Sequence, residues 1–247
     1  FLVLKGWALM GDAVSHAILP GVVLAWITGI PLIIGAFAAG MSCALLTGYL
    51  AENSRVKPDT VMGVVFSGMF GLGIVMYTAI TTNAHLDHIL FGNMLGIGPQ
   101  DLWTAGLISL AATSFLILKW RDLELQAFDP AQAKASGLSV NFLHYGLLVV
   151  LSLCIVATLS ATGLILAVAL LITPGAVAFL LVRSFGHMLI VAVIVCFLGM
   201  FLGTYASFFL DSAPAATIVL ILTAFFIAAF ITRLRDTARR SRQATEG

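Results

Sequence analysis

The residues with the clearest chemical potential lie near the start of the chain, where Asp12 and His16 stand four residues apart in an apolar stretch. On a helix this spacing brings both side chains to one face, together with Ser15. A lone carboxylate in hydrocarbon costs about 2.5 to 3.5 kcal/mol even on insertion scales, so it needs a partner and usually a purpose. Carboxylate and imidazole ligands suit a divalent first-row metal such as Mn, Fe(II) or Zn. The alternative is an Asp–His hydrogen bond that only fixes helix packing.

Further ligands must come from elsewhere, because two side chains on one helix cannot complete a coordination shell. Pro20 lacks an N–H, so we expect the carbonyl of His16 to be freed one turn above its side chain. Other spans, water or a second subunit could supply the rest. The segment His85-Leu-Asp87-His88 is a weaker metal candidate at the external entrance, and a solvated polar loop explains the same residues.

The elements that position these residues follow from composition. Of the 247 residues, 61% are hydrophobic and only 9% are charged, whereas soluble proteins carry about 25% charged residues. Apolar stretches of about 20 residues match the length that a helix needs to cross a bilayer. We therefore predict an all-α, polytopic transmembrane bundle in a single domain, residues 1–247. The net charge of +1 provides no field for attracting nucleic acid. The expected spans, about eight in number, are 7–28, 31–51, 60–80, 102–118, 142–160, 162–182, 188–209 and 214–232.

The basic residues predict the orientation of these spans. With alternating spans, all 12 Lys and Arg residues fall on one side, and the opposite loops contain none. By the positive-inside rule the basic side is cytoplasmic, which includes the basic tail 233–247 and the C-terminus. Small residues also recur at every fourth position of several spans, which predicts close helix packing. These ridges are Ala13, Ala17, Gly21 and Ala25; Ala36, Gly40, Ala44 and Gly48; Gly63, Ser67 and Gly71; and Gly199, Gly203 and Ser207.

The longest cytoplasmic loop, 119–140, contains a second informative segment. Asp129 is a suitable cap, Pro130 fits the first helical turn, and Gly137 fits the position after a helix end. Residues 131–136 are expected to form the helix between them. A short helix is poorly stable alone, so this one should dock onto a partner, unless it is an idle surface helix.

Other functions lack a signature. The chain contains no GxxxxGK[ST] phosphate loop, so it is not itself a P-loop ATPase. Its three cysteines stand apart from one another in apolar stretches and are expected to be packing thiols. The opening Phe-Leu-Val-Leu is expected to be the end of one further upstream span.

Several motifs together resemble those of the permease subunits of manganese, zinc and iron ABC importers, and the match runs in order over essentially the whole chain. The manganese and iron branch is the most similar. The matching motifs are Ala8-Leu-Met-Gly-Asp-Ala-Val-Ser-His-Ala-Ile-Leu-Pro-Gly21, Glu52-Asn-Ser-Arg55, Met62-Gly-Val-Val-Phe-Ser-Gly68, His88-Ile-Leu-Phe-Gly-Asn93 and Phe128-Asp-Pro130 with Gly137.

The resemblance implies a bundle like that of the vitamin B12 importer permeases, in a bacterial inner membrane. It implies a second, identical or paralogous permease, a cytoplasmic ATPase dimer and a periplasmic or lipid-anchored metal-binding protein as partners. Asp12 and His16 would bind the transported Mn, Fe(II) or Zn, with no resident cofactor. The loop helix would couple to the ATPase through Asp129, Pro130, Ala133, Ser136 and Gly137. The rival hypotheses are a proton-coupled secondary metal carrier and a purely structural membrane subunit.

Overall fold

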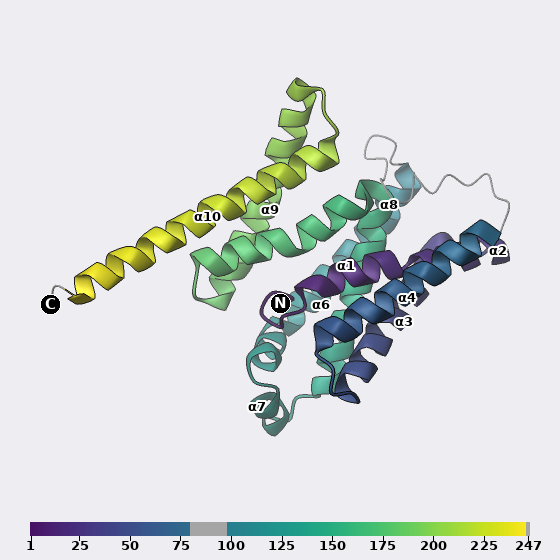
Figure 1. The fold of residues 1–247 in the computed structure, drawn as a ribbon, viewed down its shortest axis with the longest axis horizontal. Coiled ribbons are helices and arrows are strands. Elements are labelled where there is room, and N and C mark those ends of the chain that lie inside the picture. The colour runs from purple at the N-terminus through teal and green to yellow at the C-terminus, as the bar shows by residue number, and fades with distance from the viewer. Residues whose placement is uncertain (80–97, 246–247) are drawn as a thin grey trace. The chain divides into compact units, whose positions relative to one another are not determined.

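The computed structural model describes residues 1–79 and 98–245, and the regular elements in this part of the chain are all helices (Figure 1). Seven helical segments are long and apolar enough to cross a membrane, and a shorter apolar helix covers Ile165–Leu181. The predicted all-α, polytopic fold is confirmed. The helices are α1 (Ala8–Ala17), α2 (Leu19–Thr28), α3 (Leu32–Glu52), α4 (Pro58–Ala79), α6 (Pro99–Phe128), α7 (Pro130–Ala135), α8 (Val140–Leu181), α9 (Phe185–Leu210) and α10 (Pro214–Thr245).

The chain divides into two compact units at the middle of α8. The division falls next to Gly163, whose φ of 76° and ψ of 172° interrupt the helical backbone. This conformation is open to glycine because it lacks a Cβ. The sequence predicted a boundary between two spans at this place. The first unit contains α1 to α7 and the first half of α8, and the second contains the rest.

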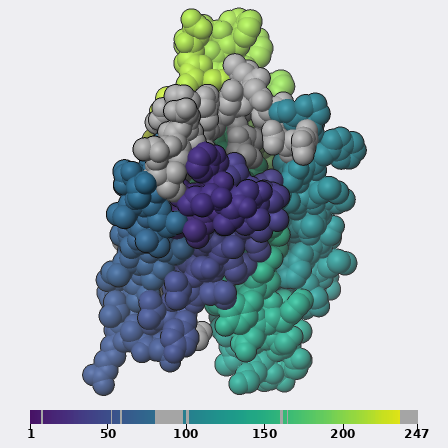
Figure 2. Space-filling model, turned by 90° about the vertical axis from the view of Figure 1, so that its right-hand side faces the viewer, coloured from purple at the N-terminus to yellow at the C-terminus, as the bar shows by residue number. Residues whose placement is uncertain are grey.

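The first span is the most buried one in the first unit, with 72% of its apolar window inside the protein. It consists of two helices, α1 and α2, which meet at Ile18 shortly before Pro20. A proline cannot donate the hydrogen bond that would continue the helix, so the break is encoded locally. Figure 2 shows the start of the chain, in purple, flanked by the blue residues that follow it and by teal residues of α6.

Small residues let the helices of the first unit approach closely, as two of the predicted ridges require. At the crossing of α2 and α3, a Cβ added to Gly21 would overlap the carbonyl oxygen of Gly35. On α3, a Cβ on Gly40 would lie 3.0 Å from Val14 of α1. Such contacts are a main source of helix association in lipid, where burying apolar surface gains little.

The ridge predicted on α4 was wrong for the packing of this chain. A Cβ on Gly63 or Gly71 would meet nothing within 4 Å, and Ser67 is exposed. The close approach on α4 is instead made by Gly73, where an added Cβ would lie 2.8 Å from Leu19. The chain therefore places a small residue of α4 against the break in the first span.

In the second unit, the small-residue face of α9 packs against α10. A Cβ added to Gly203 would lie 2.5 Å from the side chain of Ile218, and Gly199 faces Leu222 in the same way. Ser207 completes this buried face and donates a 2.8 Å hydrogen bond to the carbonyl of Thr204. The predicted ridge on this span is confirmed.

Two segments that the sequence places on the cytoplasmic side are more helical than it indicated. Helix α6 continues to Phe128, so the first ten residues of the predicted loop 119–140 belong to it. The extension is held by a cluster of Leu123, Leu143 and Leu147, all of which are buried. Helix α10 likewise continues through the basic tail as far as Thr245. The extension of α6 is explained by the apolar residues that alternate with its charged ones, because a helix places Leu123 on a buried face.

Candidate metal site and coupling helix

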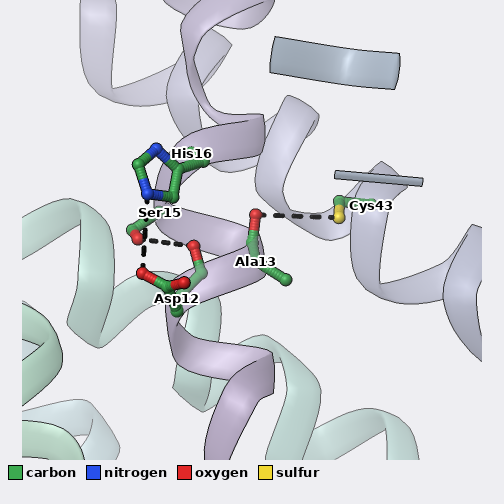
Figure 3. Close-up of polar contacts among 5 residues, drawn as sticks. All are labelled: Asp12, Ala13, Ser15, His16 and Cys43. Carbon is green, nitrogen blue, oxygen red and sulfur yellow. Dashed lines mark hydrogen bonds and ion pairs between the residues drawn. The ribbon is translucent and has the colours of Figure 1, made fainter. Parts of the chain in front are cut away.

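Asp12 and His16 lie on one face of α1, as their spacing predicted. The Nε2 atom of His16 is 3.5 Å from Oδ1 of Asp12 (Figure 3). The side chains are partly open, with exposed fractions of 28% for His16 and 41% for Asp12. Because the surrounding helices are apolar, the pair is a polar site on the most buried span of the first unit.

The separation of the two atoms is informative. A good hydrogen bond between a nitrogen and a carboxylate oxygen spans about 2.7 to 3.2 Å, so 3.5 Å is too long for a strong one. Two ligands that each lie about 2.1 Å from one metal ion are separated by about 3.0 to 3.4 Å for angles between 90° and tetrahedral. The observed separation is slightly beyond both ranges, and the two atoms lie close enough on one helix face to contact the same ion.

Ser15 lies on the same part of α1, but its side chain points to the helix backbone. Its hydroxyl donates a 2.7 Å hydrogen bond to the carbonyl oxygen of Asp12 (Figure 3). On the other side of the helix, the thiol of Cys43 lies 4.0 Å from the carbonyl of Ala13. Cys43 is fully buried, which agrees with the predicted packing role of the isolated cysteines. Neither residue adds a ligand to the pair.

The expected free carbonyl at His16 is not found. The backbone N–H of Ile18 points to this oxygen at the end of α1. The sequence argument considered only the hydrogen bond that Pro20 cannot make. It missed that the turn at Ile18 provides another donor. The carbonyl of His16 therefore already has a hydrogen-bond donor in this conformation.

Two aromatic rings of α4 surround the imidazole of His16. The ring of Phe66 is stacked on it, with 5.9 Å between centroids and 29° between planes. The ring of Phe70, one turn further along α4, meets it edge to face at 5.3 Å and 76°. The Nδ1 atom of His16 is buried and has no hydrogen-bond partner in residues 1–79 and 98–245. Sequence reasoning placed Phe66 in a motif but assigned neither ring a role.

No group of three or more His, Cys, Asp or Glu side chains that could hold a metal occurs in the described part of the chain. Asp12 and His16 alone would therefore supply only two ligands to an ion. The weaker candidates His85, Asp87 and His88 lie outside the described residues.

A cavity of about 390 Å³ opens toward the N-terminal ends of α1 and α4. Met62, which lines it, lies one helical turn before Phe66 on α4. Lys5 and Trp7 also line this cavity. Burial lowers the pKa of Lys5, and its ammonium lies 4.6 Å from the centre of the Trp7 ring. The other lining residues are Gly6, Met10, Thr47, Gly48, Ala51, Lys57, Asp59 and His144. The cavity therefore lies near the site, on the side that the basic-residue pattern predicts to be cytoplasmic.

The short helix predicted after α6 is present as α7, and each of its end signals acts as expected. The carboxylate of Asp129 accepts hydrogen bonds from the backbone of Ala131 at 3.0 Å and Gln132 at 2.9 Å. Pro130 begins the helix, and Gly137 adopts a φ of 79° after the C-cap residue Ser136. The N–H groups of Gly137 and Leu138 close the end by bonding back to Lys134 and Ala133.

Helix α7 packs against the rest of the protein through one buried residue. Ala133 is completely buried, whereas its neighbours on the helix are exposed. A six-residue helix has little stability of its own, so the two caps and this contact must hold it. The exposed residues remain available to a partner.

Comparison with known proteins decides between the hypotheses. Residues 1–233 match the ABC 3 transport family. The chain belongs to this family. It is therefore a membrane permease subunit of an ABC transport system rather than an enzyme, and the hypotheses of a secondary carrier and of a purely structural subunit are wrong.

Individual relatives agree with this assignment. The chain is 56% identical over 235 residues to the chelated iron transport system membrane protein YfeD of Yersinia pestis, covering 94% of this chain and 78% of that protein. It is 46% identical to the manganese transport system membrane protein MntB of Synechocystis, covering 94% and 76%. The solved structure of PsaBC from Streptococcus pneumoniae in complex with Fab is similar with a TM-score of 0.83 and 36% identity, covering 93% of this chain and 83% of that one.

Proposed function

We propose that this ABC 3 family permease carries a divalent transition metal, Mn or Fe(II), into the cell, and that Asp12 and His16 bind the ion on its way. Zn remains within the chemistry of this ligand pair. The proposal rests above all on the 3.5 Å separation of the two ligand atoms on the most buried span of the first unit. The functions named for its relatives, manganese and chelated iron transport, support the choice of metals.

The pair has the properties of a transient site. It offers one carboxylate oxygen and one imidazole nitrogen, so hydration water or residues of other segments must fill the remaining positions. A shell of this kind holds an ion less tightly than a closed structural site, and an ion in transit must also leave. The cavity beside Met10 and Met62 gives the ion a route of departure on the cytoplasmic side.

The energy for transport comes from partner proteins in this proposal. Two cytoplasmic ATPase subunits bind the permease, and α7 with its capping residues Asp129 and Gly137 is the element that contacts them. A second permease subunit and a periplasmic or lipid-anchored metal-binding protein complete the system. The chain lies in the bacterial cytoplasmic membrane, with the C-terminus of α10 in the cytoplasm, because the basic residues gather on that side.

The test is transport by the whole complex reconstituted in vesicles. Asp12→Ala and His16→Ala should each abolish accumulation of Mn(II), because either change leaves a single ligand from α1. Assembly with the ATPase and basal ATP hydrolysis should persist. Radiolabelled Mn(II) uptake and ATPase activity measure the two properties on the same vesicles.

Asp122→Ala is the matched control, since Asp122 forms an ion pair with Lys119 near the end of α6 and is remote in sequence from the site. It should transport normally. Normal uptake by both Asp12→Ala and His16→Ala would show that the ion takes a different path.

A further inference from the structure

We infer that Phe66 and Phe70 of α4 are positioning residues for the metal site, acting through the imidazole of His16. This inference rests on the proposed function, because it assumes that His16 is a ligand. Neither phenyl ring can bind a metal through a lone pair. Their role is to fix the direction in which the ligand nitrogen points.

The two phenyl rings restrict how the imidazole of His16 can turn. A histidine ring turns about its last side-chain bond with a broad, roughly two-fold preference, and a half-turn puts a ring carbon where each nitrogen was. Phe66 covers one face of the His16 ring at 5.9 Å, and Phe70 closes a second side at 5.3 Å. Rings at these distances are in direct packing contact, and turning the imidazole would push it into one of them.

The second step concerns the two nitrogens. Nε2 faces Asp12 at 3.5 Å, whereas Nδ1 is buried without a hydrogen-bond partner among the described residues. A metal-binding histidine usually has its second nitrogen held by a carboxylate, a carbonyl or water, which sets the ring direction. Here ring packing takes the place of that hydrogen bond. The two phenyl groups leave Nε2 as the nitrogen that is presented to an ion beside Asp12.

The third step links the arrangement to movement of the ion. The ligands belong to α1 and the rings belong to α4, so the site depends on the register of two different helices. A shift of α4 by a fraction of a turn would remove the rings from His16 and loosen one ligand. Binding and release of the ion are thereby coupled to the packing of α1 against α4, which Gly73 brings together with the break in the first span.

Equilibrium binding of Mn(II) to the purified complex, followed by electron paramagnetic resonance, tests this inference. Phe66→Leu and Phe70→Leu should each weaken binding by about 10-fold, the lower end of the loss seen when a ligand's supporting residue is removed. Phe66→Tyr keeps a ring and should restore affinity to within about twofold of the unchanged protein. In uptake assays the leucine variants should raise KM and leave the maximal rate nearly unchanged.

Three comparisons separate positioning from general damage. Phe201→Leu alters the outward-facing stacked pair of Phe197 and Phe201 on α9 and should bind Mn(II) normally. Phe66→Met preserves apolar volume without a ring, so it should fold like the parent yet bind as weakly as Phe66→Leu. In a His16→Ala background, Phe66→Leu should cause no further loss of the residual affinity.

The outcomes distinguish this inference from the function on which it rests. Unchanged affinity in both leucine variants, while Asp12→Ala loses binding, would overturn the positioning role and leave the metal site standing. An equal loss with and without His16 would also overturn it, since the rings would then act by another route. Retained Mn(II) binding in Asp12→Ala would instead refute the proposed site itself.

Discussion

The first span, which consists of α1 and α2, and the span within α6 have similar mean hydropathies, 1.4 and 1.6. Their burial differs, because 72% of the apolar window of the first span lies inside the protein and only 6% of that of the second. The first contains the small residues Ala13, Ala17 and Gly21, of which the two alanines are almost fully buried. The second carries large apolar side chains that stay exposed, such as Leu118 at 79%. Hydropathy therefore identifies a membrane span, whereas residue size indicates which span lies inside.

This difference has a physical cause. In a bilayer the lipid tails are as apolar as leucine, so an exposed leucine costs nothing and its burial gains little. Close packing of backbones does gain dispersion energy, and only small residues permit it. The broken span is thus the packing centre of the first unit, and Asp12 and His16 lie on it. Helix α6 presents its surface outward and ends at the helix α7, which is offered to a partner.

The largest difference in stability is expected when one glycine in the first span and one in α6 are each replaced by alanine. Gly21→Ala places a methyl group against the backbone of Gly35 and should destabilise the permease by about 3 kcal/mol or more, with loss of folded protein. Gly106→Ala on α6 meets nothing within 4 Å and should be neutral or slightly stabilising. Thermal unfolding in detergent measures both. Equal stabilities would remove the distinction between a packed and an outward-facing span.

A deletion of side-chain volume should give an intermediate effect. Ile18→Ala at the junction of α1 and α2 opens a cavity in a site that is 1% exposed, and should cost about 2 kcal/mol. Leu118→Ala should change the free energy of unfolding by less than about 0.5 kcal/mol, because lipid replaces the lost contacts. Chemical unfolding in lipid–detergent micelles provides the comparison. A large loss for Leu118→Ala would mean that another protein surface, rather than lipid, covers α6.

The smallest change in stability is expected at the end of α6. Asp129→Ala removes the acceptor for two backbone N–H groups of α7 and should cost about 1 kcal/mol, enough to unwind this six-residue helix. Metal-stimulated ATP hydrolysis should fall severalfold while Mn(II) binding stays intact. Asp129→Asn retains the cap and is the matched control. Loss of binding together with hydrolysis would contradict a role limited to coupling.

Much of this organisation could be predicted from the sequence. The spans, the shared face of Asp12 and His16, and the capped helix α7 depend on local spacing, which a sequence states directly. The ring contacts of Phe66 and Phe70 could not be predicted, because they depend on the register between α1 and α4. The same limitation explains the wrong ridge on α4, where Gly63 and Gly71 have the right spacing but face away from neighbouring helices. The prediction of a free carbonyl at His16 was wrong because the turn at Ile18 depends on how α1 and α2 join.

The central claim is that a passing metal ion is held between Asp12 and His16. Anomalous X-ray scattering from the intact complex soaked in Mn(II) tests it most directly. We expect an anomalous peak within coordination distance of both Oδ1 of Asp12 and Nε2 of His16, absent from Asp12→Ala. A peak elsewhere in the permease, with these two side chains unliganded, would contradict it.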